Sequence, residues 1–150
     1  MYWMYSFLLF LCLAVYLPVY WVRHRLLKKE KIHFLQRLGF GLRNWSNKKK
    51  SLWIHAVSVG EVLSLQNLMR EIKKTHRDWT IHFSCLTNSG FRMAQEKLKE
   101  ADHIFFIPLD FTILVKKFFR RIKPDIFILA ESEFWPNLLK EAKSLPWAFY

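Results

Sequence analysis

The stretch His55-Ala-Val-Ser-Val-Gly-Glu61 decides the fold prediction for this chain. The largely apolar residues 51–56 lead into it and are typical of a strand, and a helical pattern over residues 62–72 leads out of it. A strand, a tight turn and a helix place the turn residues at the mouth of an α/β sheet. Gly60 lets a substrate or another backbone segment approach closely. Glu61 is predicted to lie in the first helical turn, beside free backbone N–H groups.

Two interpretations of Glu61 remain open from these residues. A carboxylate at this place can take a proton from a substrate hydroxyl. Ser58 and Glu61 also have the spacing of a capping box, an arrangement that starts a helix and needs no function.

From Ser51 onward, strand-like and helix-like segments alternate, and a short helix is predicted before them within residues 33–42. The predicted strands cover residues 52–56, 79–85, 103–107, 126–130 and 147–150, and the predicted helices cover residues 60–74, 91–100, 111–122 and 133–143. This alternation predicts an α/β fold with a Rossmann-like parallel sheet. Residues 126–130 show no polar alternation, which predicts a strand buried on both faces.

Polar clusters follow four of the predicted strands: Ser58–Glu61, Thr87–Gly90, Pro108–Asp110 and Glu131–Asn137. Because ligands bind beyond the carboxyl ends of parallel strands, we expect the four clusters to meet at one edge of the sheet. Residues 86–90 are predicted to be a loop that either binds an anion or a hydroxyl group or forms a turn with an N-cap. Asp110 is predicted to be an N-cap more readily than a ligand contact.

The acids Glu131 and Glu133 either cap a helix or have a function, in which they hold a sugar or orient or stabilise reacting groups. We predict that Ser58, Gly60, Glu133 and Asn137 contact substrate. No Gly-rich phosphate loop and no Ser-His-Asp or Cys-His set accompanies these residues. The two cysteines and six histidines have no metal-ligand spacing, so no metal site and no cofactor are predicted.

The N-terminal third has a different composition. Residues 1–22 contain no charged side chain and have aromatic residues at both ends, which predicts one transmembrane helix that anchors the chain. Residues 23–50 form a basic collar and linker with ten Lys or Arg and one acid, and so carry +9 of the formal net charge of +12. This charge predicts a cytoplasmic C-terminal part and attraction to anionic membrane lipids. No nucleic-acid-binding motif is present, so nucleic acid is not a predicted partner.

Nearly the whole chain resembles the 3-deoxy-D-manno-octulosonic acid (Kdo) transferases, which add Kdo to lipid A in Gram-negative bacteria. The resemblance rests on Trp53-Ile-His-Ala-Val-Ser-Val-Gly-Glu61, Leu86-Thr-Asn-Ser-Gly90, Pro108-Leu-Asp110, Glu131-Ser-Glu-Phe-Trp-Pro-Asn137 and Arg37-Leu-Gly39. The first and fourth segments are long and specific. The loop at 86–90 departs from the Thr-rich form usual in the family, so the resemblance implies no role there.

The resemblance implies a two-domain GT-B glycosyltransferase with an inverting mechanism. Residues 51–150 match the N-terminal, acceptor-side domain, and the chain ends before the domain that binds the donor CMP-Kdo. Glu61 matches the general base, which deprotonates a hydroxyl of the lipid A precursor (lipid IVA), and Glu131 matches a position that stabilises the transition state. The family context implies an inner-membrane anchor, with the catalytic part on the cytoplasmic face.

A second class of function also remains open. The same edge of the sheet, without catalysis, would serve a membrane-anchored module that binds an anionic lipid or a partner protein. A third alternative is an inactive fragment, because the donor-binding part lies outside these 150 residues.

Overall fold

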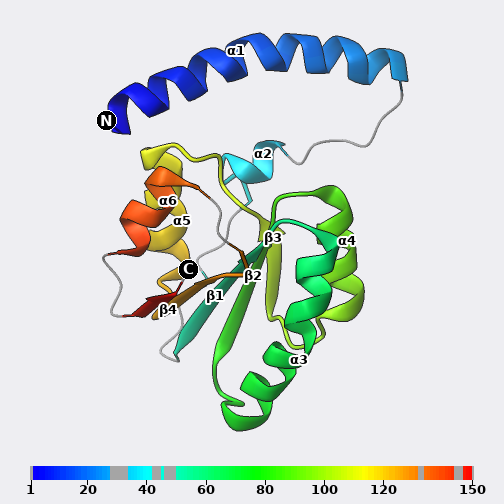
Figure 1. The fold of residues 1–150 in the computed structure, drawn as a ribbon, viewed down its shortest axis with the longest axis vertical. Coiled ribbons are helices and arrows are strands. Elements are labelled where there is room, and N and C mark those ends of the chain that lie inside the picture. Colours follow the sequence, from blue (N-terminus) through cyan, green and yellow to red (C-terminus); the bar gives the residue numbers. More distant parts are fainter. Residues whose placement is uncertain are drawn as a thin grey trace.

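The computed structural model describes residues 2–27, 34–41, 45, 50–131, 134–143 and 147–149. Its centre is a five-stranded parallel sheet with the order β3-β2-β1-β4-β5 (Figure 1). The strands are β1 (Ser51–Ala56), β2 (Thr80–Cys85), β3 (His103–Phe106), β4 (Ile126–Leu129) and β5 (Trp147–Phe149). This is the strand order of a Rossmann-like sheet, and the predicted parallel α/β fold is confirmed.

Two helical layers cover the sheet (Figure 1). On one face, α3 (Val59–Thr75) and α4 (Asn88–Lys97) pack on Ile54 and Phe83. On the other face, α5 (Thr112–Ile122) and α6 (Pro136–Ala142) pack on a cluster around Trp53 and Phe127. Burial of these apolar side chains on both faces supplies the main driving force for folding.

Burial along the strands differs from the prediction in one respect. Every residue of β1 and β2 is buried, but β4 alternates between half-buried and buried positions. Phe127 and Leu129 face the α5–α6 core, whereas Ile126 and Ile128 lie at the margin of the α3–α4 core and are partly covered. The predicted burial of β4 is therefore complete on the α5–α6 face and partial on the α3–α4 face.

The starts of α3 and α5 lie within one residue of the prediction, whereas those of α4 and α6 each differ from it by three residues. α4 begins at Asn88 instead of residue 91, because the Thr87 hydroxyl accepts a hydrogen bond from the Gly90 N–H and caps the helix. α6 begins at Pro136 instead of residue 133, since Pro136 takes the first helical turn, where a missing N–H costs nothing.

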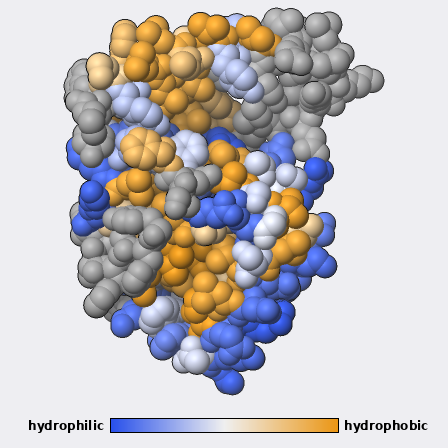
Figure 2. Space-filling model, in the orientation of Figure 1, coloured by the Kyte–Doolittle hydropathy of each residue, from blue (hydrophilic) through white to orange (hydrophobic). Residues whose placement is uncertain are grey.

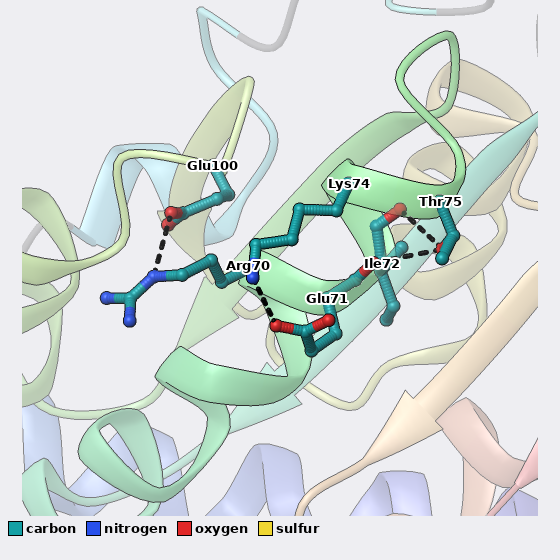
Figure 3. A network of polar contacts seen from close by, with 6 residues as sticks. All are labelled: Arg70, Glu71, Ile72, Lys74, Thr75 and Glu100. Carbon is teal, nitrogen blue, oxygen red and sulfur yellow. Dashed lines mark hydrogen bonds and ion pairs between the residues drawn. The ribbon is translucent and has the colours of Figure 1, made fainter.

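Polar side chains on α3 cluster near its C-terminal end (Figure 3). Arg70 Nε lies 3.7 Å from Glu100 Oε1, and Lys74 Nζ lies 2.6 Å from Glu71 Oε1. The Thr75 hydroxyl donates to the carbonyls of Glu71 and Ile72. α3 is 17 residues long. These contacts therefore lie about 20 Å from the start of the helix.

The N-terminal segments lie over the carboxyl end of the sheet. α1 (Tyr2–Leu27) is a 26-residue helix, and α2 (Phe34–Arg37) is a short turn of helix (Figure 1). α1 forms an apolar band along the top of the molecule (Figure 2). Hydrophilic residues cover much of the opposite, lower end of the molecule (Figure 2). Within the described residues, no helix has the length and hydropathy of a membrane span. The transmembrane helix predicted from residues 1–22 stays a prediction.

Candidate functional site

Glu61 occupies the third position of α3, directly beyond the carboxyl end of β1. Its Oε2 accepts a hydrogen bond from the Val57 N–H (2.8 Å), and its Oε1 accepts one from the Ser58 N–H (3.0 Å). The Ser58 hydroxyl in turn accepts from the Glu61 N–H (3.3 Å), so the predicted capping box is present. These hydrogen bonds fix the orientation of the buried Glu61, and each carboxylate oxygen can still accept a further hydrogen bond.

The glycines of the site have different surroundings. A Cβ added to Gly60 would meet one atom within 4 Å, the Ser58 hydroxyl oxygen at 3.9 Å. No described backbone segment therefore approaches Gly60 closely, and its predicted contact with substrate stays a prediction. At Gly90 an added Cβ would lie 3.0 Å from Thr87 Oγ1 and 3.2 Å from the Val57 carbonyl oxygen. The close approach of two backbone segments occurs at Gly90.

The first turn of α4 lies against the turn that precedes Glu61. Thr87 Oγ1 donates to the Val57 carbonyl (2.9 Å) and accepts from the Gly90 N–H (3.1 Å). The capped turn predicted for residues 86–90 is present, and the alternative that this loop binds a ligand stays a prediction. The clusters after β1 and β2 are thus in direct contact.

The cluster after β4 lies beside the cluster after β1. The Ala130 N–H donates to the His55 carbonyl (2.9 Å), which holds the end of β4 against the end of β1. Glu131 follows and its side chain is exposed. The structure therefore places Glu61 and Glu131 beyond the ends of adjacent strands. Glu133 lies outside the described residues, and its predicted role is untested.

Asp110 and Asn137 form a buried connection between the clusters after β3 and β4. The Asp110 carboxylate accepts hydrogen bonds from the N–H groups of Asn137 (3.1 Å) and Leu138 (2.8 Å). Burial raises the pKa of Asp110, and these two backbone hydrogen bonds oppose the rise. The N-cap position of α5 is Phe111, so Asp110 does not cap the helix that follows it in sequence. It binds the first turn of α6 instead.

Asn137 is fully buried, and its side chain bonds to protein groups. Its amide nitrogen donates to the Asp110 carbonyl, and its Oδ1 accepts from the Thr112 hydroxyl (2.8 Å). Ser6 of α1 lies 3.4 Å from the same amide nitrogen. The predicted substrate contact of Asn137 stays a prediction, and the structure adds a role in holding the loop at residue 110.

The chain is similar to proteins of one known family. The family model described as 3-deoxy-D-manno-octulosonic-acid transferase (kdotransferase) matches residues 32–147, which include every site residue above except Ser6. The chain belongs to the Kdo transferase family. Its N-terminal resemblance to these enzymes is thereby confirmed, and a glycosyltransferase activity is supported at the level of the family.

Individual Kdo transferases match most of the chain. The enzyme from Rickettsia bellii is 32% identical over 139 residues, which cover 93% of this chain and 33% of the relative. The enzyme from Chlamydophila psittaci is 30% identical over 129 residues, which cover 81% of this chain and 30% of the relative. A probable mitochondrial Kdo transferase of Arabidopsis thaliana is 33% identical over 94 residues. The chain thus spans about a third of the length of the first two relatives.

Arg37 is a further residue of the candidate site, and its contacts were not predicted from the sequence. The Arg37 guanidinium donates to the Leu86 carbonyl at the end of β2 and lies 5.2 Å from the centre of the Phe106 ring. Its own carbonyl accepts a hydrogen bond from the Leu109 N–H (3.4 Å). Burial lowers the pKa of Arg37. The Arg37-Leu-Gly39 motif marked this residue in the sequence, but only the fold shows what it contacts.

The site contains hydrogen-bonding groups and carboxylates. Among the residues that the structure describes, no group of three or more His, Cys, Asp or Glu side chains is arranged to hold a metal ion. Two carboxylates that could act as acid or base stand beyond adjacent strands at this edge, the buried Glu61 and the exposed Glu131.

Proposed function

We propose that the protein to which this chain belongs transfers Kdo from CMP-Kdo to the lipid A precursor lipid IVA, in lipopolysaccharide core biosynthesis. Family membership supports the transferase class. The observation that carries the proposal is the Glu61 carboxylate, which two backbone N–H groups hold in one orientation beyond the end of β1.

In the proposed reaction, Glu61 takes the proton from an acceptor hydroxyl. The hydroxyl oxygen forms a bond to the anomeric carbon of Kdo, and the bond from that carbon to the CMP phosphate oxygen breaks. CMP leaves with the electron pair, and the anomeric configuration inverts. Glu131 stabilises the positive charge that develops on the sugar in the transition state. Ser58, Gly60, Glu133 and Asn137 are the proposed substrate contacts.

The proposal divides the reaction between two domains. Residues 51–150 form the acceptor-side domain of a GT-B enzyme, and a further domain binds CMP-Kdo. The relatives are about three times as long as the matched part of this chain, which supports this division. No cofactor and no metal take part.

We also propose that the protein works at the cytoplasmic face of the inner membrane, with α1 as its anchor. Among the α1 side chains that the structure describes, eight large apolar ones are exposed. Outside α1, exposed apolar side chains at the same end of the domain are Leu35, Phe40, Ile113 and Phe134, with exposed fractions of 62–82%. The basic residues between α1 and β1 would face anionic lipid head groups.

The variant Glu61→Gln tests the catalytic proposal in the complete protein. Glutamine is accepted at this position of a capping box and keeps one of the two acceptor oxygens, so the fold is expected to survive. Loss of the base should lower the rate of Kdo transfer by about 100-fold or more, with acceptor binding retained. Ser64→Ala, which removes a hydroxyl of the same helix that bonds the Glu61 carbonyl, is the control and should keep nearly full activity.

One observation favours the alternative of a non-catalytic binding module. Both oxygens of Glu61 already accept a backbone hydrogen bond, one from the Ser58 N–H of the capping box and one from the Val57 N–H. If Glu61→Gln transfers Kdo as fast as the unchanged protein, Glu61 only caps the helix, and the proposed base is wrong. If the complete protein transfers no Kdo at all while it still binds lipid A-type vesicles, the binding module replaces the enzyme.

A further inference from the structure

The residue that precedes the Ser58–Glu61 turn is held on both sides. The Val57 N–H donates to Glu61 Oε2 (2.8 Å), and the Val57 carbonyl accepts from Thr87 Oγ1 (2.9 Å). The two peptide groups that flank Val57 are thus tied to different elements. The peptide before Val57 donates its N–H to Glu61 of α3. The peptide after Val57 accepts, through its carbonyl, from Thr87 at the start of α4.

Thr87 is itself firmly placed. Its hydroxyl accepts from the Gly90 N–H (3.1 Å), and the absence of a side chain at Gly90 lets α4 approach the Val57 carbonyl. On the other side of Thr87, the Leu86 carbonyl accepts a hydrogen bond from the Arg37 guanidinium. The Nε of Arg37 is buried and has no hydrogen-bond partner among the described residues. The hydrogen bond to the Leu86 carbonyl is therefore important for holding this side chain.

We propose that Thr87 is a positioning residue that fixes the Glu61 carboxylate through the Val57 peptide, and that Arg37 supports it by holding the end of β2. This inference rests on the proposed role of Glu61 as the base. Thr87 touches no reacting atom in this account. Because a displacement of about 1 Å can slow a reaction by about 100-fold, losing the Thr87 hydroxyl should lower turnover more than acceptor binding.

Three variants of the complete protein test the role of Thr87. Thr87→Val removes the hydroxyl and keeps the shape of the side chain, and Thr87→Ser keeps the hydroxyl. Thr75→Val is the matched control, because its hydroxyl bonds only carbonyls at the far end of α3 (Figure 3). We expect Thr87→Val to lower kcat about tenfold with the acceptor KM changed less than about twofold. Thr87→Ser and Thr75→Val should stay within about twofold in both.

Amide hydrogen exchange supplies a readout that needs no activity. The Val57 N–H is protected by its bond to Glu61, so looser positioning should show as faster exchange at Val57. We expect about tenfold faster exchange in Thr87→Val and no change in Thr75→Val. The proposal is overturned if Val57 exchange is unchanged in Thr87→Val, or if the two valine variants have the same kcat.

Failure of the proposed base or of the proposed function would look different. If the base is wrong, Glu61→Gln keeps full transfer activity, whatever Thr87→Val does, and if the function is wrong, the unchanged complete protein transfers no Kdo. Exchange at Val57 still decides then whether Thr87 orders the turn before Glu61.

A double variant tests the part assigned to Arg37. Arg37→Met removes the bond to the Leu86 carbonyl, and Arg77→Met, in the exposed turn after α3, is its charge-matched control. If Arg37 acts through Thr87, Arg37→Met combined with Thr87→Val should be about as slow as Thr87→Val alone. Multiplied effects of the two changes would show that Arg37 acts by another route and would refute its place in the proposal.

Discussion

Gly60 and Gly90 lie in the first turns of neighbouring helices, but only Gly90 has backbone atoms against it. Gly90→Ala would push its Cβ to 3.2 Å from the Val57 carbonyl oxygen, so it should destabilise the protein by about 1–3 kcal/mol. Gly60→Ala has room, and should leave the free energy of unfolding unchanged or raise it by about 0.5 kcal/mol.

Chemical denaturation of the two alanine variants, followed by circular dichroism, measures this difference. Equal stabilities would contradict the observed packing at Gly90. The same pair also bears on function, because a loss of transfer activity in a fully stable Gly60→Ala variant would support the proposed substrate contact at Gly60.

His82 is a buried imidazole in β2, and both of its ring nitrogens have no hydrogen-bond partner among the described residues. Its ring stacks on His103 at 5.0 Å and lies 5.7 Å from the Trp45 ring. Burial and, to a smaller extent, His103 lower the pKa of His82, Asp102 opposes them, and the resulting pKa is about 4. The fold therefore favours the neutral ring.

This depressed pKa predicts a pH dependence of stability. In the unfolded chain His82 takes up its proton near pH 6.5, whereas in the folded chain it does so near pH 4. The stabilising contribution is present above pH 6.5 and is lost as the pH falls to 4, at a cost of about 3 kcal/mol. Urea unfolding at pH 7 and at pH 4 measures this loss. Between the two pH values, the free energy of unfolding should fall less for His82→Phe than for the unchanged protein. His76→Phe, at an exposed position, is the control and should behave like the unchanged protein.

At the scale of elements, α6 depends on a residue from another loop. This helix has seven residues and no side-chain N-cap, and the Asp110 carboxylate binds two of its first N–H groups. Asp110→Ala leaves these buried donors without a partner, and should lower the free energy of unfolding by about 2 kcal/mol. Asp78→Ala, in an exposed turn, should change it by less than about 0.5 kcal/mol. Thermal unfolding compares the two, and equal melting temperatures would argue against this tie.

At the scale of the whole molecule, the exposed apolar residues gather where α1 and the candidate site also lie. If this end faces a membrane, Phe134 should lie in contact with lipid, whereas Leu68 on the outer face of α3 should not. Both positions carry an exposed apolar side chain, but they lie in different parts of the domain, so they form a matched pair.

Fluorescent labels on single cysteines measure this arrangement. Phe134→Cys or Leu68→Cys is combined with Cys12→Ser, and Cys85 is left in place because it is fully buried. In vesicles with anionic lipid, spin-labelled lipid should quench the label at position 134 several-fold more than the label at position 68. Equal quenching would refute the proposed membrane-facing end.

Much of the fold follows from local sequence patterns. The apolar segments and the helical periodicity between them predicted all five strands and the order of the helices, because each pattern depends on residues close together in the chain. The place of Glu61 in the first turn of α3 was also predictable, since its capping box spans four residues. The start of α4 was missed by three residues because Thr87 was assigned to a loop that continues to Gly90.

Contacts between loops followed only from the tertiary structure. Asp110 binds a helix that begins 26 residues later, Thr87 bonds Val57 across 30 residues, and Arg37 reaches the carbonyl of Leu86 across 49. No local periodicity encodes such pairs, because they arise where the parallel strands end side by side. The amino-acid order thus determined the strands, the helices and the acid that begins α3. The assembled sheet decided which loops hold that acid in place, since only the strand order brings their hydrogen-bonding groups within reach.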